Sequence, residues 1–205
     1  MATESVRFYF DPTCPWAWQT AKWMWEVQEV RDVKVRWALF SLRLVNESID
    51  DPLTDTSAKS VPALRALALA EREHGQDAMA GLYRAIGSRI HDGDAALSPQ
   101  TLAEAVEEAE LPADIVARAL ADPSTAEDVR AQHREAAESV EAFGVPTIVL
   151  ASGRGIFGPV VALAPAGEAA GELWDHARWL ADLDGFFELK RGRDRRPGDA
   201  VPATA

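Results

Sequence analysis

The chain has 205 residues, 47% hydrophobic and 26% charged, a composition typical of one globular domain or of one domain with a large insertion. Its 33 acidic residues exceed its 21 lysines and arginines, and the net charge of −12 argues against a general nucleic-acid binder. The single cysteine, Cys14, excludes an intramolecular disulfide and a thiolate zinc cluster.

The first part of the chain predicts a strand, a helix and a second strand. Residues 6–10 and 33–40 alternate in hydrophobic character, as strands do. Asp11 and Pro12 end the first strand, and a helix is expected over about 15–30. A strand–helix–strand unit of this length predicts two parallel strands joined by a crossover helix.

The middle region, about residues 57–143, is predicted to be helical throughout, because no part of it alternates with a period of two. Gly75 is placed to end one helix, and Ser98-Pro99 to begin another. The segment Ser124-Thr125-Ala126-Glu127 has the pattern of a capping box that opens the last helix of the region. This region is therefore expected to be a helical insertion in an α/β fold.

The last part of the chain returns to strands. Residues 147–150 and 155–157 predict a hairpin around a short loop that contains a glycine. A final helix is expected over about 166–183, where apolar residues form one stripe. The tail from Arg191 is predicted to be disordered, and its arginines are interpreted as a solvated terminus rather than a nucleic-acid arm.

Cys14 lies where the first strand gives way to the first helix. Free backbone N–H groups and the positive end of the helix dipole stabilise a thiolate at such a position. Pro15 suits the first helical turn, because proline has no N–H to leave unpaired. The residues alone leave two interpretations open: Cys14 is a nucleophile, or it is a buried structural cysteine, the commonest state of an unpaired one.

A second feature favours the nucleophile. The segment Gly144-Val145-Pro146-Thr147 comes directly before an apolar strand. Proline at the start of a strand is unusual and often marks a cis peptide bond.

The order of these elements resembles the thioredoxin-like fold of DsbA type, in which a helical domain is inserted between two halves. Five segments are similar to one branch in particular, the actinobacterial mycothiol-dependent reductases of DsbA type, one member of which is described as a nitroreductase. They are residues 10–18, Ser41-Leu42 with Asn46-Glu47, residues 89–91, residues 157–159 and residues 186–190. The resemblance covers nearly the whole chain. It implies a discontinuous thioredoxin-like domain (1–56 and 143–190), a helical insertion (57–142) and a flexible tail (191–205).

The resemblance also implies roles for individual residues. Cys14 is expected to be the catalytic nucleophile, and Val145 to offer its backbone to a bound thiol or peptide beside a cis Pro146. Trp16 is expected to form a wall of the substrate site. The full set of expected substrate-binding residues is Pro15, Trp16, Asn46, His91, Val145 and Pro146. For His91 a second interpretation stays open, in which the ring binds terminal carbonyls at a helix end.

Ala17 departs from the family pattern, since it stands where the resolving cysteine of Cys-Pro-Trp-Cys is expected. A dithiol enzyme uses that second thiolate to release its substrate from the mixed disulfide. Without it, Cys14 must wait for an external thiol. We therefore expect a monothiol cycle, in which Cys14 attacks, a low-molecular-weight thiol resolves the mixed disulfide, and that thiol leaves as its disulfide.

The histidines and tryptophans were weighed as further site residues. No two histidines and a carboxylate have metal-site spacing, so no metal is expected. His74 and His133 lie on predicted helices among charged residues, and we expect both to face solvent. The tryptophans of the first helix cannot all face inward from one side of it; they are Trp16, Trp18, Trp23 and Trp25. Core packing is the expectation for each of them except Trp16, and an aromatic cluster near Cys14 that stacks a flat substrate stays open as the alternative.

These observations predict a cytoplasmic thiol-dependent oxidoreductase or transferase without a bound cofactor. No basic start followed by an apolar run marks a signal peptide, and no stretch reaches the ~18 apolar residues of a membrane span. Mycothiol, or another low-molecular-weight thiol, is the co-substrate that the resemblance implies. The expected partners are small thiols or disulfides and nitroaromatic compounds, with no nucleic acid and no membrane; a homodimer is left open.

Two alternatives remain from the sequence. One is a non-redox binding protein that keeps the thioredoxin fold. The other is an enzyme similar to kappa-class glutathione transferases or hydroxychromene-carboxylate isomerases, which usually carry serine at the position of Cys14. A thiol pKa near the free value of ~8.5 favours binding, and one below ~7 favours thiol chemistry.

Overall fold

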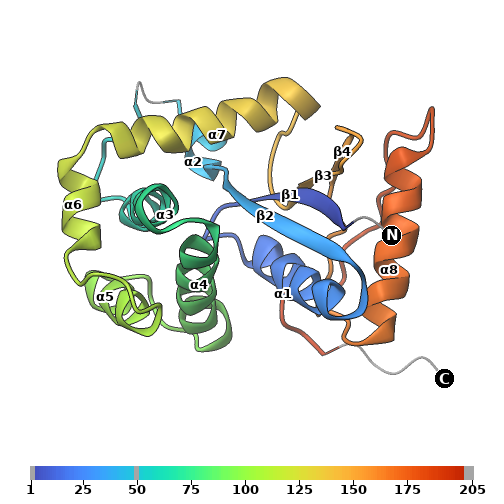
Figure 1. The fold of residues 1–205 in the computed structure, drawn as a ribbon, viewed down its shortest axis with the longest axis horizontal. Coiled ribbons are helices and arrows are strands. Elements are labelled where there is room, and N and C mark those ends of the chain that lie inside the picture. The colour runs from blue at the N-terminus through green and yellow to red at the C-terminus, as the bar shows by residue number, and fades with distance from the viewer. Residues whose placement is uncertain (1–2, 49–50, 201–205) are drawn as a thin grey trace.

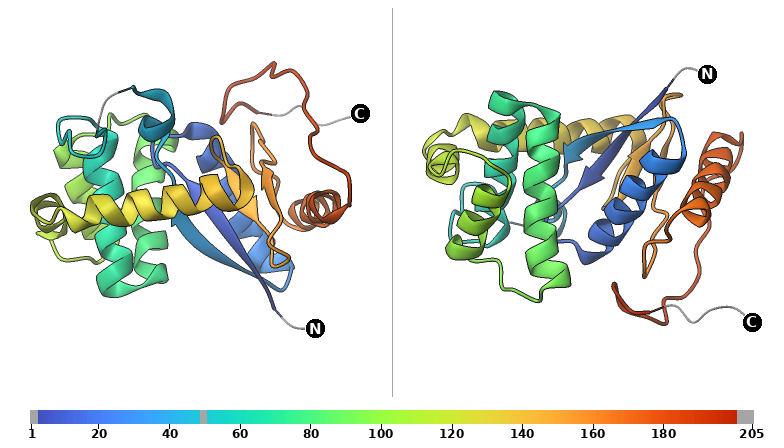
Figure 2. Two further views of the ribbon diagram at one scale, coloured as in Figure 1. Left: turned by 90° about the horizontal axis from the view of Figure 1, so that it is seen from above. Right: turned by 60° about the horizontal axis from the view of Figure 1, so that its bottom comes forward.

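The computed structural model describes residues 3–48 and 51–200. Its centre is a four-stranded sheet with the strand order β2-β1-β3-β4. Helices α1 and α8 lie side by side on one face of the sheet and α7 crosses the other face, while the remaining long helices gather beyond the end of the sheet (Figure 1). The view from above shows α7 running across β1 and β2 (Figure 2).

The first three elements confirm the predicted parallel pair with its crossover helix. They are β1 (Glu4–Phe10), α1 (Pro15–Val30) and β2 (Val33–Leu39). The two strands are parallel, with Glu4 opposite Val33 and Phe10 opposite Leu39. The apolar positions of β2 point alternately into the core, which is the period-two pattern visible in the sequence.

The predicted hairpin is also present, although its strands are short. It consists of β3 (Thr147–Val149) and β4 (Gly155–Phe157), which pair antiparallel. Strand β3 also pairs antiparallel with β1. The amino end of β3 therefore lies beside the carboxyl end of β1, and this places Pro146 and Cys14 at the same edge of the sheet. The last helix, α8, spans Glu168–Asp182.

The middle region is helical, as predicted. Its elements are α3 (Ser60–His74), α4 (Gln76–Gly87), the π-helical turn η1 (Ser88–Asp92), α5 (Pro99–Glu108), α6 (Ile115–Ala121) and α7 (Ser124–Val140). Gly75 ends α3 with φ +87°, and the Ser98 hydroxyl accepts a hydrogen bond from the Thr101 N–H, as expected of a cap. The domain boundaries at 57 and 142 stay predictions, and residues 201–205 of the predicted flexible tail lie outside the described residues.

Two local predictions need correction. The capping box at Ser124 is wrong, because Ser124 already lies inside α7 and the carboxylate of Asp122 accepts hydrogen bonds from both its N–H and its hydroxyl. Asp122, which precedes Pro123, therefore caps the start of α7. Proline suits the start of a helix but has no side-chain acceptor for the free N–H groups. The sequence also missed α2 (Leu42–Asn46), a helix too short to show periodicity.

Helix α1 buries tryptophans on two flanks rather than one. Trp23 donates from Nε1 to the Ala170 carbonyl of α8 at 2.9 Å, whereas Trp18 meets the ring of Tyr83 in α4 edge-on at 5.6 Å between centroids. Trp25 is half-buried between Trp18 and Trp37. Because α1 is enclosed by α8 on one side and α4 on the other, two of its tryptophans are core residues at once. No helix in the described ranges is long and apolar enough to cross a membrane.

Candidate active site

Cys14 caps the start of α1 with its own side chain. Its Sγ accepts a hydrogen bond from the Ala17 N–H at 3.4 Å, and its backbone φ and ψ are extended, as an N-cap requires. The thiol lies 3.7 Å from the Val145 carbonyl, to which the S–H donates. Cys14 is 7% exposed and Ala17 is fully buried, so the thiol lies in a nearly closed environment.

The segment Gly144–Thr147 forms the wall opposite Cys14. The Val145–Pro146 peptide bond is cis, as is Gly158–Pro159. Thr147 donates its hydroxyl to the Gly144 carbonyl at 2.8 Å and pairs with Tyr9 of β1. The sheet register thus brings a segment far away in the sequence against the sulfur.

Asp11 holds the loop that carries Cys14, and sequence reasoning missed this role. One of its carboxylate oxygens accepts from the Thr13 N–H at 2.9 Å and the Thr13 hydroxyl at 2.6 Å, and the other accepts from the Leu42 N–H at 2.8 Å. Its backbone carbonyl accepts from the Cys14 N–H at 3.0 Å. Complete burial raises the pKa of Asp11 above its usual value, although these hydrogen bonds oppose the shift. An aspartate at a strand end, two residues before a threonine, is a pattern that could have predicted this turn.

His91 contacts the same loop from η1. Its Nε2 lies 2.9 Å from the Pro12 carbonyl, so the ring donates a hydrogen bond to another segment and not to a terminal carbonyl of its own helix. Burial lowers the pKa of His91 below its usual value, which keeps the ring neutral at pH 7. An ion pair between Lys22 and Asp92 at 2.7 Å fastens η1 to α1 beside it.

The other expected binding residues differ in their exposure and in their contacts. Pro15 is exposed at the first position of α1, and Trp16 is half-buried with the Arg193 guanidinium over its ring, 4.7 Å from the centroid. Asn46 is exposed at the end of α2, and the hydrogen bonds within the described ranges include none from its side chain. Helix α2 is held to the Cys14 loop at its start, where the Leu42 N–H donates to Asp11, and Asn46 lies at its other end.

The ionisation of Cys14 differs from the expectation for a helix start. Burial raises the pKa of the thiol above its usual value, and the negative charge of Asp11 adds to the rise. The N–H groups of Ala17 and Trp16 and the charge of Arg193 oppose it without reversing it. The start of the helix supplies the expected N–H donors, which lower the pKa of the thiol. Burial removes water from the thiolate and raises the pKa by more than these donors lower it.

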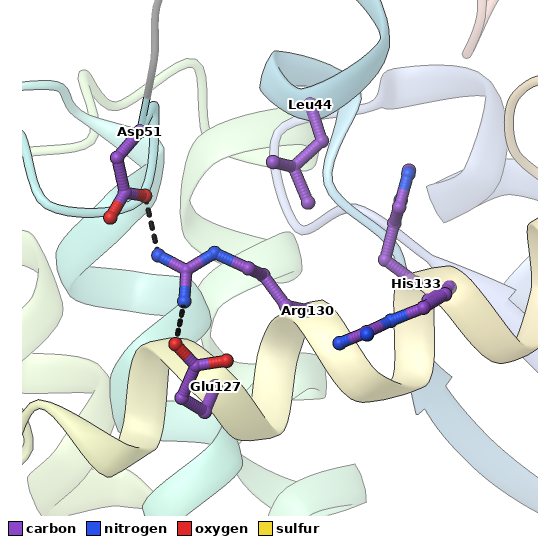
Figure 3. Close-up of a pocket in the computed structure, with 6 residues that line it drawn as sticks. Leu44, Asp51, Glu127, Arg130 and His133 are labelled. Atoms are coloured by element: carbon purple, nitrogen blue, oxygen red, sulfur yellow. Dashed lines mark hydrogen bonds and ion pairs between the residues drawn. The ribbon is translucent and has the colours of Figure 1, made fainter.

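Two cavities are lined by residues other than Cys14. One of about 530 Å³ borders α7, where Figure 3 shows Arg130 extending between Asp51 and Glu127. His133 in this cavity is half-buried, contrary to the expectation that it faces solvent: its ring packs on Phe40 and accepts from the Ser41 N–H at 3.4 Å. A second cavity of about 480 Å³ lies over Trp18 and Trp25. Among the residues that the structure describes, no three His, Cys, Asp or Glu side chains form a group that could hold a metal ion.

Two comparisons of the sequence with known proteins give matches over most of the chain. A family model described as "Rv2466c-like: Mycothiol-dependent nitroreductase Rv2466c" matches residues 13–191. An uncharacterised protein of Mycobacterium tuberculosis, Rv2286c, is 33% identical over 190 residues, which cover 91% of this chain and 81% of the relative.

Solved structures show the same fold. A probable DsbA oxidoreductase from Streptomyces coelicolor superposes with a TM-score of 0.62 at 24% identity, over 97% of this chain and 99% of that one. The cytosolic disulfide reductase DsbM from Pseudomonas aeruginosa, solved with GSH, gives 0.59 at 18% identity, over 85% and 99%. A 2-hydroxychromene-2-carboxylate isomerase gives 0.60 at 16% identity, over 85% and 93%. The predicted α/β fold of DsbA-type thioredoxin-like proteins is confirmed.

Proposed function

The chain belongs to the Rv2466c-like family, and we propose on this premise that it is a mycothiol-dependent reductase that works through one cysteine. The observation that carries the proposal is the Cys14 thiol at the start of α1, 3.7 Å from the Val145 carbonyl and with Ala17 behind it. A cytoplasmic location is part of the proposal, since thiols stay reduced in that compartment.

The monothiol cycle needs two exchanges. The Cys14 thiolate attacks one sulfur of a disulfide; a Cys14–sulfur bond forms, the disulfide bond breaks, and the leaving thiolate takes the electron pair and later a proton. Mycothiol then attacks the mixed disulfide as its thiolate, which frees Cys14 and gives the disulfide of mycothiol with the bound thiol. One disulfide and one thiol enter, and one disulfide and one thiol leave.

A nitroaromatic substrate fits the same thiol balance. Reduction of a nitro group to a nitroso group takes two electrons, which two thiols supply as they form one disulfide, with one water released. Cys14 and one mycothiol would provide these thiols, and a second mycothiol would release Cys14. No bound cofactor enters this scheme.

The surroundings of the thiol support a place for a small substrate. Val145 presents its carbonyl to Cys14, so a bound thiol would run beside the backbone of residues 144–147. Trp16 would form the side wall, and Pro15 and Pro146 the rim. His91 would act from behind, through the Pro12 carbonyl of the Cys14 loop. Asn46 belongs to the proposed site only as a distal contact to a larger ligand, because it lies at the far end of α2.

A second candidate, a non-redox binding protein, is favoured by one observation. Burial raises the pKa of Cys14, and a protonated thiol is a poor nucleophile. The pH dependence of Cys14 alkylation separates the two candidates, because the binding protein needs no reactive thiolate. Turnover that requires a thiol but leaves the thiol–disulfide balance unchanged would instead indicate an isomerase or a conjugating enzyme.

The deciding experiment is mass spectrometry after incubation with oxidised mycothiol. We expect the protein to gain the mass of one mycothiol, with the adduct on Cys14, and to lose it when reduced mycothiol is added. The Cys14→Ser variant is the control and should gain nothing. If the unmodified protein forms no adduct between pH 7 and 9, the reductase proposal is overturned in favour of the binding protein.

A further inference from the structure

The C-terminal strap, defined as residues 191–200, returns to the start of α1 instead of leaving the molecule. Gly198 donates its N–H to the Ala162 carbonyl at 2.6 Å, and a Cβ on Gly198 would lie 3.7 Å from the side-chain nitrogen of Gln19. Figure 2 shows the chain leaving the end of α8 and turning back. The strap therefore lies against the same helix start that carries Cys14.

Arg193 is the strap residue that contacts Trp16, beside Cys14. Its guanidinium carbon stands 4.7 Å from the centroid of the Trp16 ring, a cation–π distance, and Trp16 is two residues from Cys14. None of the ion pairs in the described part of the chain includes Arg193, whereas its neighbour Arg195 lies 3.6 Å from Asp194. A cation without a carboxylate partner is thus held on an aromatic ring at the edge of the thiol site.

We propose that Arg193 is the electrostatic partner of the Cys14 site, offsetting the negative charge that sulfur carries whenever Cys14, a leaving thiol or an attacking thiol is ionised. The inference rests on the proposed function and goes beyond it, because it assigns a role to a residue outside the segment that the family model matches. It also assigns the strap a part in the reaction.

The chemistry of exchange creates the need for such a partner. Thiol–disulfide exchange passes through an arrangement of three sulfurs that shares one negative charge. The ionisable groups around Cys14 are Asp11 in its loop, Tyr83 in α4, His91 in η1 and Arg193 in the strap. Burial raises the pKa of Tyr83 and lowers that of His91, which leaves both neutral at pH 7. Of the four, Arg193 alone is a cation, and its charge lowers the pKa of Cys14 against the effect of burial.

Alkylation of Cys14 tests this without any need for mycothiol. The variants are Arg193→Gln, which removes the charge, Arg193→Lys, which keeps it, and Arg196→Gln, which removes a charge three residues along the same strap. The rate of Cys14 alkylation is measured from pH 6 to 10 with neutral iodoacetamide and with anionic iodoacetate.

For Arg193→Gln we expect the iodoacetamide rate at pH 7 to fall roughly threefold and the midpoint of the pH profile to rise by about half a unit. The alkylation rate should fall more with iodoacetate than with iodoacetamide. Both reagents meet less Cys14 thiolate in the variant, but the iodoacetate anion also loses its attraction to the Arg193 cation. Arg193→Lys should keep most of the rate, and Arg196→Gln should match the unmodified protein. High salt should shrink the difference, since the Debye length falls to about 3 Å at 1 M.

The inference is overturned if Arg193→Gln and Arg196→Gln have the same rates and midpoints. It is also overturned if the alkylation rate falls as much in Arg193→Lys as in Arg193→Gln. Packing of the arginine on Trp16, and not its charge, would then explain the lower rate. Absence of a mycothiol adduct, by contrast, counts against the proposed function and leaves these rates unaffected.

Discussion

The Cys14 site and the cavity at Arg130 place polar groups in opposite ways. Cys14 is buried, its thiol makes two long hydrogen bonds, and the nearest cation comes from the end of the chain. The Arg130 cavity, of about 530 Å³, is rich in charge, but Arg130 is already paired with Asp51 and Glu127 (Figure 3). Paired charges line the cavity, whereas a buried thiol with only weak, long hydrogen bonds marks the Cys14 site.

This difference shows why the Arg130 cavity is not where we place the chemistry. A charge that is satisfied by a neighbour has little left to offer a ligand, because binding would first have to break the existing pair. A buried thiol with only long hydrogen bonds, by contrast, gains from a partner that brings a second sulfur. The following substitutions break or sharpen the comparison, in order of the expected size of effect.

Cys14→Ser should have the largest effect. A serine hydroxyl keeps the size of the side chain but does not ionise near neutral pH, so it cannot open a disulfide. We expect mycothiol-dependent turnover of a disulfide or nitroaromatic substrate to fall by ~10³-fold or more, with the far-UV spectrum unchanged. Turnover within tenfold of the unmodified protein would show that the chemistry lies elsewhere.

Ala17→Cys should restore an internal resolving thiol. Residues three apart on a helix are neighbours, and the Ala17 N–H already contacts the Cys14 sulfur. We expect an internal disulfide under mild oxidation and a mycothiol adduct on Cys14 that lasts roughly tenfold less, with a packing cost of about 1 kcal/mol because Ala17 is fully buried. Adduct lifetime is measured by mass spectrometry.

The matched control for this change is Ala21→Cys, which is buried on the same helix. Seven residues along α1 correspond to about 10 Å, which is too far for a disulfide with Cys14. An adduct lifetime shortened equally in both variants would contradict the resolving role of position 17.

His91→Gln should change how stability depends on pH. Burial lowers the pKa of His91, so the unfolded chain binds more protons than the folded one below about pH 6.5, and stability is lost as pH falls through that range. Glutamine can still donate to the Pro12 carbonyl but does not titrate. We expect the loss of unfolding free energy between pH 7.5 and 5.5 to shrink by up to about 1 kcal/mol, measured by urea unfolding.

The unfolding free energy of His91→Gln should still decrease somewhat as pH falls from 7.5 to 5.5, a dependence called the acid slope below, because burial also lowers the pKa of His133. His176→Gln, at an exposed position on α8, serves as the comparison variant. An acid slope identical in the two variants would mean that His91 is not held neutral by its site.

Arg130→Gln should have the smallest effect on both stability and turnover. It tests whether the Arg130 cavity takes part in the chemistry. Its ion pairs with Asp51 and Glu127 are partly exposed, and such pairs contribute about 0–1 kcal/mol. We expect unfolding free energy to change within that range and turnover to stay within twofold. A tenfold loss of turnover would reverse the comparison and assign the chemistry to the cavity.

Local signals in the sequence predicted much of this molecule. The alternation in β2, the cap at Ser98 and the turn at Gly75 each depend on a few neighbouring residues, so they could be interpreted without a partner. The position of Cys14 at a strand–helix junction is local in the same sense. Other features could not be predicted in this way. A helix of five residues such as α2 is too short to show a periodicity in the sequence. The capping role of Asp122 was missed because the capping-box pattern of residues 124–127 directly follows it.

By itself, then, the sequence determined the α/β order of elements, the presence of a single cysteine, Cys14, and the alanine that stands three residues after it at position 17. Tertiary structure decided what surrounds that nucleophile: the Val145 carbonyl facing it, the fastening of its loop by Asp11, and the cation brought by Arg193. It also decided the direction of the Cys14 pKa. The physical reason is that hydrogen bonding along a chain is local, whereas burial and charge depend on segments that meet only after folding.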